Sequence, residues 1–121
     1  MFREEFLQEV KEARMEARMG KLIDWKELQK SWKKSHEKIW AFIYFQIWET
    51  YSKLTKPLKE RIDKAIEKIC ENPYFGKPLK YELKGTRRIH IGPFVLIYSI
   101  KEKKRQVIFL KFAHHDEAYK L

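Results

Sequence analysis

Cysteine is almost absent from this chain, and long hydrophobic runs are missing altogether. Cys70 is the one cysteine in 121 residues, which excludes an intrachain disulfide and a zinc site built from several cysteines. The longest apolar run, Ile39 to Trp48, is too short to span a membrane. The first twenty residues carry charges throughout, unlike a secretory signal peptide. We therefore expect a cytoplasmic protein with no membrane partner.

Glycine is also scarce and scattered, which removes several common site motifs. The sequence holds four glycines and contains no Gly-rich phosphate loop, no GxSxG motif and no HExxH motif. It shows no internal repeat and no low-complexity segment. We expect no cofactor and no bound metal.

Positive charge is the most abundant feature. Lysine and arginine total 27 against 17 acidic residues, a formal charge of +10. Residues 1–36 hold nine basic and seven acidic side chains, whereas residues 37–121 hold eighteen and ten. This bias predicts a partner that carries phosphates for the second part of the chain. A charge-rich surface of the kind found in heat-adapted proteins would give the same composition, so charge alone does not decide between them.

The first part of the chain is expected to be helical. Residues 2–18 place apolar side chains near the 3.6-residue period with charges between them, and Gly20 ends this helix. Asp24 then resembles an N-cap, with Glu27 completing a capping box, for a second helix that runs to about His36.

The next stretch, Glu37 to Tyr51, is ambiguous. Its isoleucines continue the helical spacing of the preceding residues, yet IWAFIYF has the aromatic and β-branched density of a buried strand. Short apolar runs of this kind leave strand and helix both open.

The remainder predicts one helix followed by a small sheet. Pro57 suits the first turn of an amphipathic helix that Asn72-Pro73 ends. A loop with two prolines and two glycines follows, and then three strand-like runs separated by Gly92-Pro93 and by KEKKR. These runs are residues 87–91, 94–100 and 106–112. Helices followed by a meander predict one domain of the α+β class.

The loop before the strands gathers cations. Arg88 and His90 share one face of their strand, while Ile89 and Ile91 point to the opposite face and into a core. An arginine and an imidazole beside lysines can bind and cleave a phosphodiester without a metal. A plain solvated basic face is the alternative. The basic residues within twelve positions are Lys77, Lys80, Lys84, Arg87 and Arg88.

The C-terminal tail His114-His115-Asp116-Glu117-Ala118-Tyr119 is also rich in reactive groups. A metal site is disfavoured, because adjacent histidines diverge and no further ligand is placed to complete it. A surface tail with one packed histidine is a second interpretation. A third uses histidine as a proton shuttle, with Tyr119 stacking on a base or donating a proton.

Residues about 38–119 resemble the RelE/ParE superfamily of toxins from type II toxin–antitoxin systems, in particular the archaeal-type RelE proteins. The matching pieces are KLTKPLKERIDKAIEKICENP, GKPLKYELKG, RRIHIGPFVLIYSI and VIFLKFAHHDEAY, in the family's order. The resemblance implies a mainly antiparallel four-stranded sheet packed with two helices. It favours a strand at 38–44 and a helix at 46–54.

The resemblance also implies a function and a site. It implies a metal-independent endoribonuclease that cleaves messenger RNA at the ribosome, with a RelB-type antitoxin as partner. The implied phosphate-binding residues are Lys77, Lys80, Lys84 and Arg87, and the implied catalytic residues are Arg88, His90, His114 and Tyr119. The alternative is a non-catalytic protein of the same fold, either a gyrase inhibitor or an inactive relative that binds an antitoxin.

Three departures from the family pattern concern this site. His90 stands where many relatives carry arginine, and Val95 replaces an arginine that is common in the next strand. The tail reads His-His-Asp where many relatives read His-Arg-Arg, so His115 also replaces an arginine. The site has lost positive charge and gained imidazole.

Residues 1–36 lie outside this resemblance and form an N-terminal helical extension to a toxin domain at 37–121. EEFLQEVKEARMEARMGKLIDWKELQKSW is similar to the C-terminal stretch of RelB-type antitoxins. Such a segment would lie across the toxin surface in cis and mask it. The alternative is an extension that packs on the sheet or mediates dimerisation.

Overall fold

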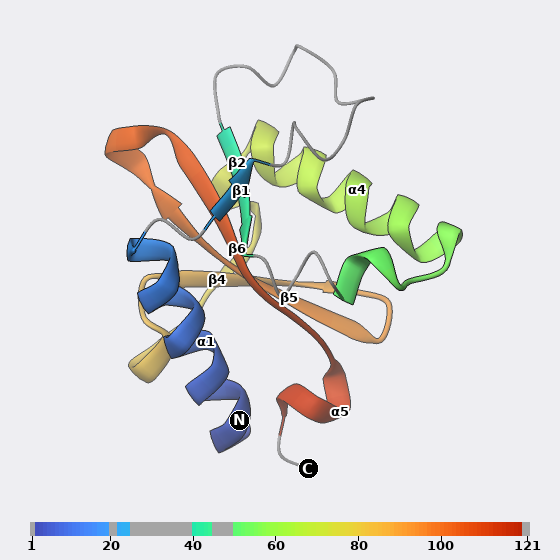
Figure 1. The fold of residues 1–121 in the computed structure, drawn as a ribbon, viewed down its shortest axis with the longest axis horizontal. Helices are drawn as coiled ribbons and strands as arrows, with labels where there is room; N and C mark the ends of the chain where they lie inside the picture. Colours follow the sequence, from blue (N-terminus) through green and yellow to red (C-terminus); the bar gives the residue numbers. More distant parts are fainter. Residues whose placement is uncertain (1, 20–21, 25–39, 45–49, 120–121) are drawn as a thin grey trace.

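A computed structural model describes residues 2–19, 22–24, 40–44 and 50–119 of the chain (Figure 1). The strands form one sheet, and helices pack against it. The α-helices are α1 (Glu4–Arg18), α4 (Lys56–Glu71) and α5 (His115–Ala118), and the 3-10 helices are η2 (Pro73–Phe75), η3 (Tyr81–Leu83) and η4 (Glu102–Lys104). The strands are β1 (Leu22–Asp24), β2 (Trp40–Tyr44), β3 (Lys77–Pro78), β4 (Thr86–Ile91), β5 (Phe94–Lys101) and β6 (Gln106–His114).

The strands form one sheet in the order β1-β2-β6-β5-β4-β3. β2 runs parallel to β6, and every other neighbouring pair is antiparallel. The four strands expected from the sequence are therefore confirmed as the centre of the sheet, and the ambiguous stretch near residue 40 is a strand. Two short edge strands, β1 and β3, were not expected, because two or three residues are too few to show a period.

Helix α4 covers one face of the sheet. Pro57 lies in its first turn and Asn72 ends it, as the sequence predicts. Its buried side chains recur on one helical face and pack against the strands. Those side chains are Ile62, Ile66, Ile69 and Cys70.

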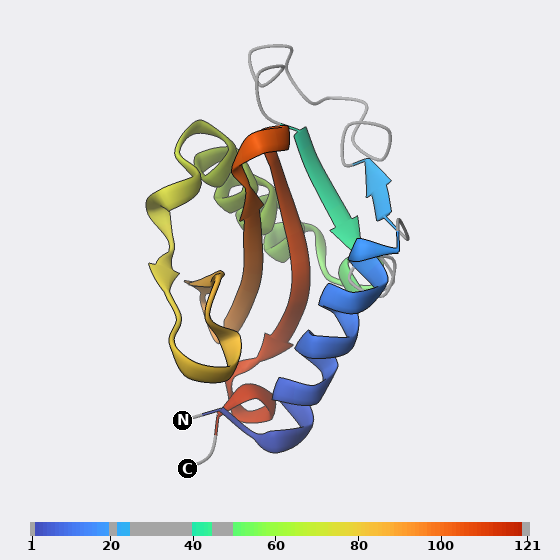
Figure 2. The same cartoon turned by 90° about the vertical axis from the view of Figure 1, so that its left-hand side faces the viewer.

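Helix α1 packs on the opposite face, as the two orientations of the ribbon show (Figures 1 and 2). Phe6, Val10 and Ala13 are at most 2% exposed. Phe6 and Val10 lie in a cluster with Val95 and Ile97 of β5. Burying side chains of this size stabilises the docked helix by about 1.5–3 kcal/mol each.

Alternation along the strands assigns each side chain to one of these two faces. Leu96 and Tyr98 belong to the core beneath α4, whereas Val95 and Ile97 lie beneath α1. Arg88 pairs with Ile97 and His90 pairs with Val95, so both β4 side chains share the face that α1 covers.

Two helix predictions fall largely beyond the described residues. Of the helix expected at 46–54, residues 50–52 are helical and residues 53–54 form a turn. Residues 46–49 lie outside the described residues. Asp24 ends β1, and the helix it was expected to cap also lies outside the described residues. None of the helices in the described ranges has the length and apolar composition that crossing a lipid bilayer requires.

Candidate functional site on the face beneath helix α1

The basic loop is anchored by a buried tyrosine. Tyr98 Oη donates a hydrogen bond to the Pro73 carbonyl at 2.7 Å and accepts one from the Gly76 amide at 2.8 Å. A Cβ atom at Gly76 would lie 2.5 Å from that hydroxyl, so only glycine fits. Burial raises the pKa of Tyr98, which keeps the phenol protonated and able to donate. The start of the loop is thereby fixed to β5.

Arg88 is the central cation of the face beneath α1. Its Nη1 donates a hydrogen bond to the hydroxyl of Tyr119, which connects β4 to the C-terminal tail. Its Nε is buried and has no hydrogen-bond partner among the described residues. A buried donor without a partner costs about 1–3 kcal/mol. The guanidinium is therefore held in place with part of its donor capacity unused.

Two imidazoles and a phenol gather beside this arginine. The ring centroids of His115 and Tyr119 lie 4.6 Å apart, those of His90 and Tyr119 lie 6.1 Å apart, and those of His90 and His115 lie 6.3 Å apart. His90 is exposed, and His115 is half-buried. The arrangement offers a cation, two imidazoles and a hydroxyl donor within one small area.

The surroundings of His90 favour its neutral form. Partial burial, the positive charge of Arg88 and the charge of His115 when protonated all lower the pKa of His90. A neutral imidazole has an acceptor nitrogen, so at neutral pH His90 can take a proton from a bound hydroxyl.

The tail histidines do not both reach this cluster. His114 is the last residue of β6, and its ring packs edge-on against Phe94 at 5.5 Å. Its Nδ1 accepts a hydrogen bond from the Asp116 amide at 3.1 Å, as the cap of α5. His115 joins His90 and Tyr119 instead. Of the two histidines that the resemblance implied as catalytic, His90 lies beside Tyr119 and His115, whereas His114 packs on Phe94.

The predicted phosphate-binding residues divide between the two faces. Lys77 pairs with Arg88, so its exposed side chain lies on the same face. Lys80 and Lys84 flank η3 and are also exposed. Arg87 lies on the other face, where its Nη1 donates hydrogen bonds to the Tyr74 and Gly76 carbonyls at 3.1 and 2.6 Å. Arg87 therefore holds the start of the loop through hydrogen bonds on the face opposite Arg88.

The N-terminal residues hold the tail in place. Phe2 stacks on Tyr119 with ring centroids 4.7 Å apart, and the two residues form an isolated antiparallel bridge. Arg3 Nε donates hydrogen bonds to the carbonyls of Asp116 and Tyr119 at 2.9 and 3.2 Å. The two ends of the chain lie together in both ribbon views (Figures 1 and 2). Tyr119 is thus enclosed by Phe2 on one side and by the His90–His115 cluster on the other.

Charged side chains join the rest of α1 to the same face. Glu9 forms an ion pair with Lys111 of β6. Lys11 Nζ lies 3.3 Å from a carboxylate oxygen of Glu82 in η3. Arg14 Nη1 donates to the Lys84 carbonyl at 3.3 Å. Helix α1 therefore contacts both the basic loop and β6.

A groove of about 360 Å³ lies between α1 and η3, bordered by Phe2, Lys80 and Tyr81. Tyr81 is 91% exposed and has a positive φ of 58°, a strained conformation for a non-glycine residue. Its ring is open for stacking on a nucleobase. The sequence analysis did not select Tyr81, although its position between Lys80 and Lys84 gave a signal.

Within the described ranges, no three side chains of histidine, cysteine, aspartate or glutamate converge in the way that a metal site needs.

A family model described as the ParE toxin of type II toxin–antitoxin systems matches residues 26–119. The chain belongs to the RelE/ParE toxin superfamily. This match includes every strand of the sheet except β1, and helix α1 lies outside it. The basic loop, the Arg88 strand and the tail are all within it.

Two archaeal proteins show the relationship at the sequence level. The chain is 38% identical over 76 residues to a protein named "Putative toxin RelE4" from Methanocaldococcus jannaschii, a match that spans 62% of this chain and 81% of the relative. It is 37% identical over 73 residues to an uncharacterised protein of Methanosarcina mazei, which spans 57% of this chain and 85% of that protein.

A solved structure supports the same assignment. The chain is similar to a chain of the toxin–antitoxin complex RelBE2 from Mycobacterium tuberculosis, with a TM-score of 0.56 and 25% sequence identity. The similarity covers 61% of this chain and 94% of that chain. The α+β fold of a RelE-type toxin, expected from the sequence, is confirmed. The chain is thus a toxin of the type II toxin–antitoxin class.

Proposed function

We propose that this toxin is a metal-independent endoribonuclease that cleaves messenger RNA, with the ribosome as the place of action. The observation that carries the proposal is the grouping of Arg88, His90, His115 and Tyr119 beside an exposed lysine-rich loop. These groups meet the needs of phosphodiester cleavage by an internal hydroxyl.

The roles follow from the protonation and placement of each group. His90 takes the proton of the ribose 2′-hydroxyl, whose oxygen forms a new bond to the adjacent phosphorus. The bond from phosphorus to the 5′-oxygen breaks, and His115 or Tyr119 gives that oxygen a proton. Arg88 stabilises the charge that develops on the phosphate. The products are a 2′,3′-cyclic phosphate and a 5′-hydroxyl.

Lys77, Lys80 and Lys84 hold the RNA backbone in this proposal. All three are exposed; Lys77 lies on the strand that pairs with Arg88, and Lys80 and Lys84 flank η3 in the basic loop. Because backbone contacts of this kind release counterions, RNA affinity falls steeply as salt rises.

We further propose that the N-terminal extension, residues 1–36, covers this site through α1 and that a RelB-type antitoxin is the partner in trans. The support is the position of α1 on the Arg88 face, together with the sequence similarity of this segment to antitoxins. Val95, which replaces a family arginine, is fully buried beneath Phe6 and Val10. An arginine there would be buried under α1, so the replacement is compatible with a covered face. Tethering gives the cover an effective concentration on the order of millimolar.

A second candidate function is a non-catalytic toxin that inhibits DNA gyrase or binds only an antitoxin. The matching family model is described as ParE, and the guanidinium of Arg88 is already engaged by Tyr119, which favours this candidate. Such a protein would have little RNA affinity at physiological salt.

The deciding experiment is the cleavage of a reporter message in a translating cell-free system. Cleavage that persists in chelator and leaves cyclic phosphate ends, and that Arg88→Ala abolishes, supports the nuclease. Lys64→Ala is the control, because it removes one exposed cation from α4, which covers the opposite face of the sheet. Full cleavage by Arg88→Ala would remove Arg88 from the proposal.

A further inference from the structure

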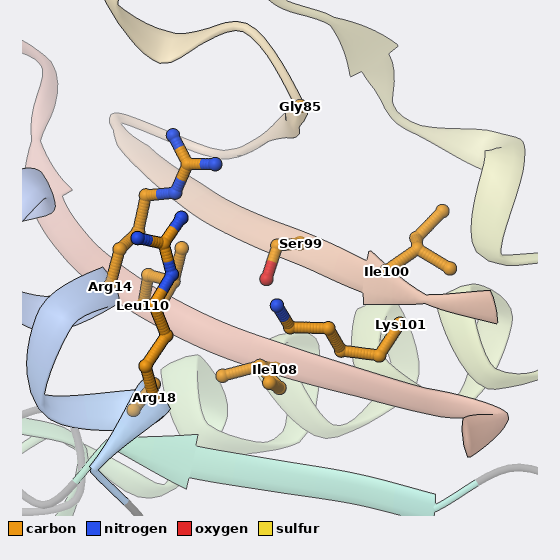
Figure 3. A pocket seen from close by; sticks show the side chains of 9 residues that line it. Arg14, Arg18, Gly85, Ser99, Ile100, Lys101, Ile108 and Leu110 are labelled. Atoms are coloured by element: carbon orange, nitrogen blue, oxygen red, sulfur yellow. The ribbon is translucent and has the colours of Figure 1, made fainter. Parts of the chain in front are cut away.

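A second basic pocket lies on the α1 face, away from the Arg88 cluster. It has a volume of about 140 Å³ and opens between the last turn of α1, Gly85 and the end of β5 (Figure 3). Ser99 in this pocket pairs with Thr86, whereas His90 pairs with Val95. Four residues of strand separate the two pairs, which is roughly 13 Å. The pocket is therefore distinct from the candidate cleavage site.

Three cations line this pocket and no acidic side chain does. Arg14 and Arg18 come from α1, and Lys101 comes from the end of β5. Burial and then the charge of Arg18 lower the pKa of Arg14. Within the described part of the chain, neither Arg18 nor Lys101 forms an ion pair. Positive side chains from α1 and from β5 thus lie around one pocket that no acidic side chain lines.

A serine hydroxyl adds a further donor. Ser99 is 8% exposed and lines the same pocket. Figure 3 shows this hydroxyl and the Lys101 ammonium directed into the space that the two arginines border. A hydroxyl beside these cations suits a ligand that accepts hydrogen bonds.

We propose that this pocket binds a phosphate group and that the bound phosphate holds α1 against the sheet. Two guanidinium groups, an ammonium and a hydroxyl are all donors, which suits an anion that has several acceptor oxygens. A pocket of this size holds a phosphate together with a few waters, since one water occupies about 30 Å³. The proposal stands without RNA cleavage, because it concerns only binding.

Phosphate in this pocket would connect α1 to β5, because the hydrogen-bond donors come from both elements. Two come from the helix and two from β5, so a phosphate between them forms bonds that exist only while α1 is docked. A ligand that binds the docked state alone stabilises that state in proportion to its occupancy. It also removes the repulsion among the three cations. Phosphate is therefore expected to slow the opening of α1.

The test uses the full chain and inorganic phosphate, with chloride at matched ionic strength as the reference. Phosphate is titrated by calorimetry, and amide hydrogen exchange of α1 is followed in the same buffers. We expect saturable binding and slower α1 exchange, with affinity reduced about tenfold or more in Arg18→Ala and in Lys101→Ala, because each removes charge-assisted hydrogen bonds. Lys103→Ala is the matched control, since this exposed lysine of η4 lies outside the pocket.

A second arm distinguishes the sources of the phosphate. A single-stranded RNA without terminal phosphates is added to the phosphate-bound protein. Displacement of phosphate would assign the pocket to an RNA backbone, and its retention would assign the pocket to free phosphate or a phosphomonoester. Equal phosphate affinity in the parent protein, Arg18→Ala and Lys101→Ala would overturn the proposal. Binding that leaves α1 exchange unchanged would overturn the link to helix docking.

Discussion

Arg88 and Tyr119 are joined by a hydrogen bond from the arginine Nη1 to the tyrosine hydroxyl, although one lies in β4 and the other at the end of the tail. The same tyrosine ring stacks on Phe2 at the start of the chain. One side chain therefore connects the candidate phosphate-binding arginine to the N-terminal segment.

Tyr119→Phe keeps the ring and removes the hydroxyl. If the hydroxyl supports Arg88 and a proton transfer, RNA cleavage is expected to fall by about 10²–10⁴-fold, the range for losing a proton-transfer group. The stacking on Phe2 remains, so the change in melting temperature should reflect only the hydrogen bond that Arg88 loses. A single-turnover cleavage rate checks this. Tyr81→Phe is the matched control, and a Tyr119→Phe rate equal to that of the parent would exclude a role for the hydroxyl.

The pH dependence of cleavage depends on His90. Burial and then neighbouring positive charge lower the pKa of His90 in the folded protein below the usual histidine pKa of about 6.5. His90 should therefore stay neutral, and able to act as a base, at a lower pH than an ordinary histidine. The rate is expected to decline only in mildly acidic buffer. His90→Gln should remove most activity together with this acidic limb. If His90→Gln keeps the same decline of the cleavage rate at acidic pH, a group other than His90 titrates there.

The same shift predicts an effect on stability. Because the folded pKa lies below the unfolded one, the unfolded chain binds more protons in the interval between them. The free energy of unfolding should therefore fall as pH drops below about 6.5 and level off once His90 is protonated in both states. Urea unfolding at several pH values measures this. Compared with the parent protein, His90→Gln should lose less stability over that interval, and an identical loss would contradict the expected linkage.

Tyr98→Phe tests the anchor of the basic loop. It removes the hydroxyl that accepts from the Gly76 amide and donates to the Pro73 carbonyl, which leaves the amide buried without a partner. The free energy of unfolding should fall by about 1–3 kcal/mol. Chemical denaturation measures the change. Tyr81→Phe, at an exposed ring, should have almost no effect, and an equal loss in both variants would argue against the anchor.

Much of the fold was predictable because its residues show clear periods. The apolar face of α4 repeats at helical spacing, and β4 to β6 are bounded by Gly92-Pro93 and a charged turn. The placement of Arg88 and His90 on one face and of Ile89 and Ile91 on the other also followed from strand alternation, and the burial of both isoleucines confirms it.

The rest depended on contacts that no local pattern encodes. β1 and β3 are too short to show alternation. His115 replaces His114 beside His90 because β6 ends at His114 and α5 begins, so the strand period stops there. The docking of α1 on the face that carries Arg88 joins residues seventy or more positions apart, as the contact of Arg14 with Lys84 illustrates.

A ribonuclease face that α1 covers can be tested by primer-extension mapping of a translated reporter message, in which the parent chain is compared with three variants. Glu9→Lys places a lysine beside Lys111 and replaces an ion pair with repulsion. A change of about 1–2 kcal/mol would raise the open fraction roughly 5–30-fold. Glu12→Lys makes the same charge change on an exposed part of α1. Glu9→Lys with Arg88→Ala removes the site.

We predict faster cleavage by Glu9→Lys than by the parent or by Glu12→Lys, and none by the double variant. Equal cleavage by the parent and both single variants would show that α1 is not a cover. No cleavage by any folded variant, with α1 amide exchange confirmed to be faster in Glu9→Lys, would contradict the nuclease and favour the non-catalytic toxin.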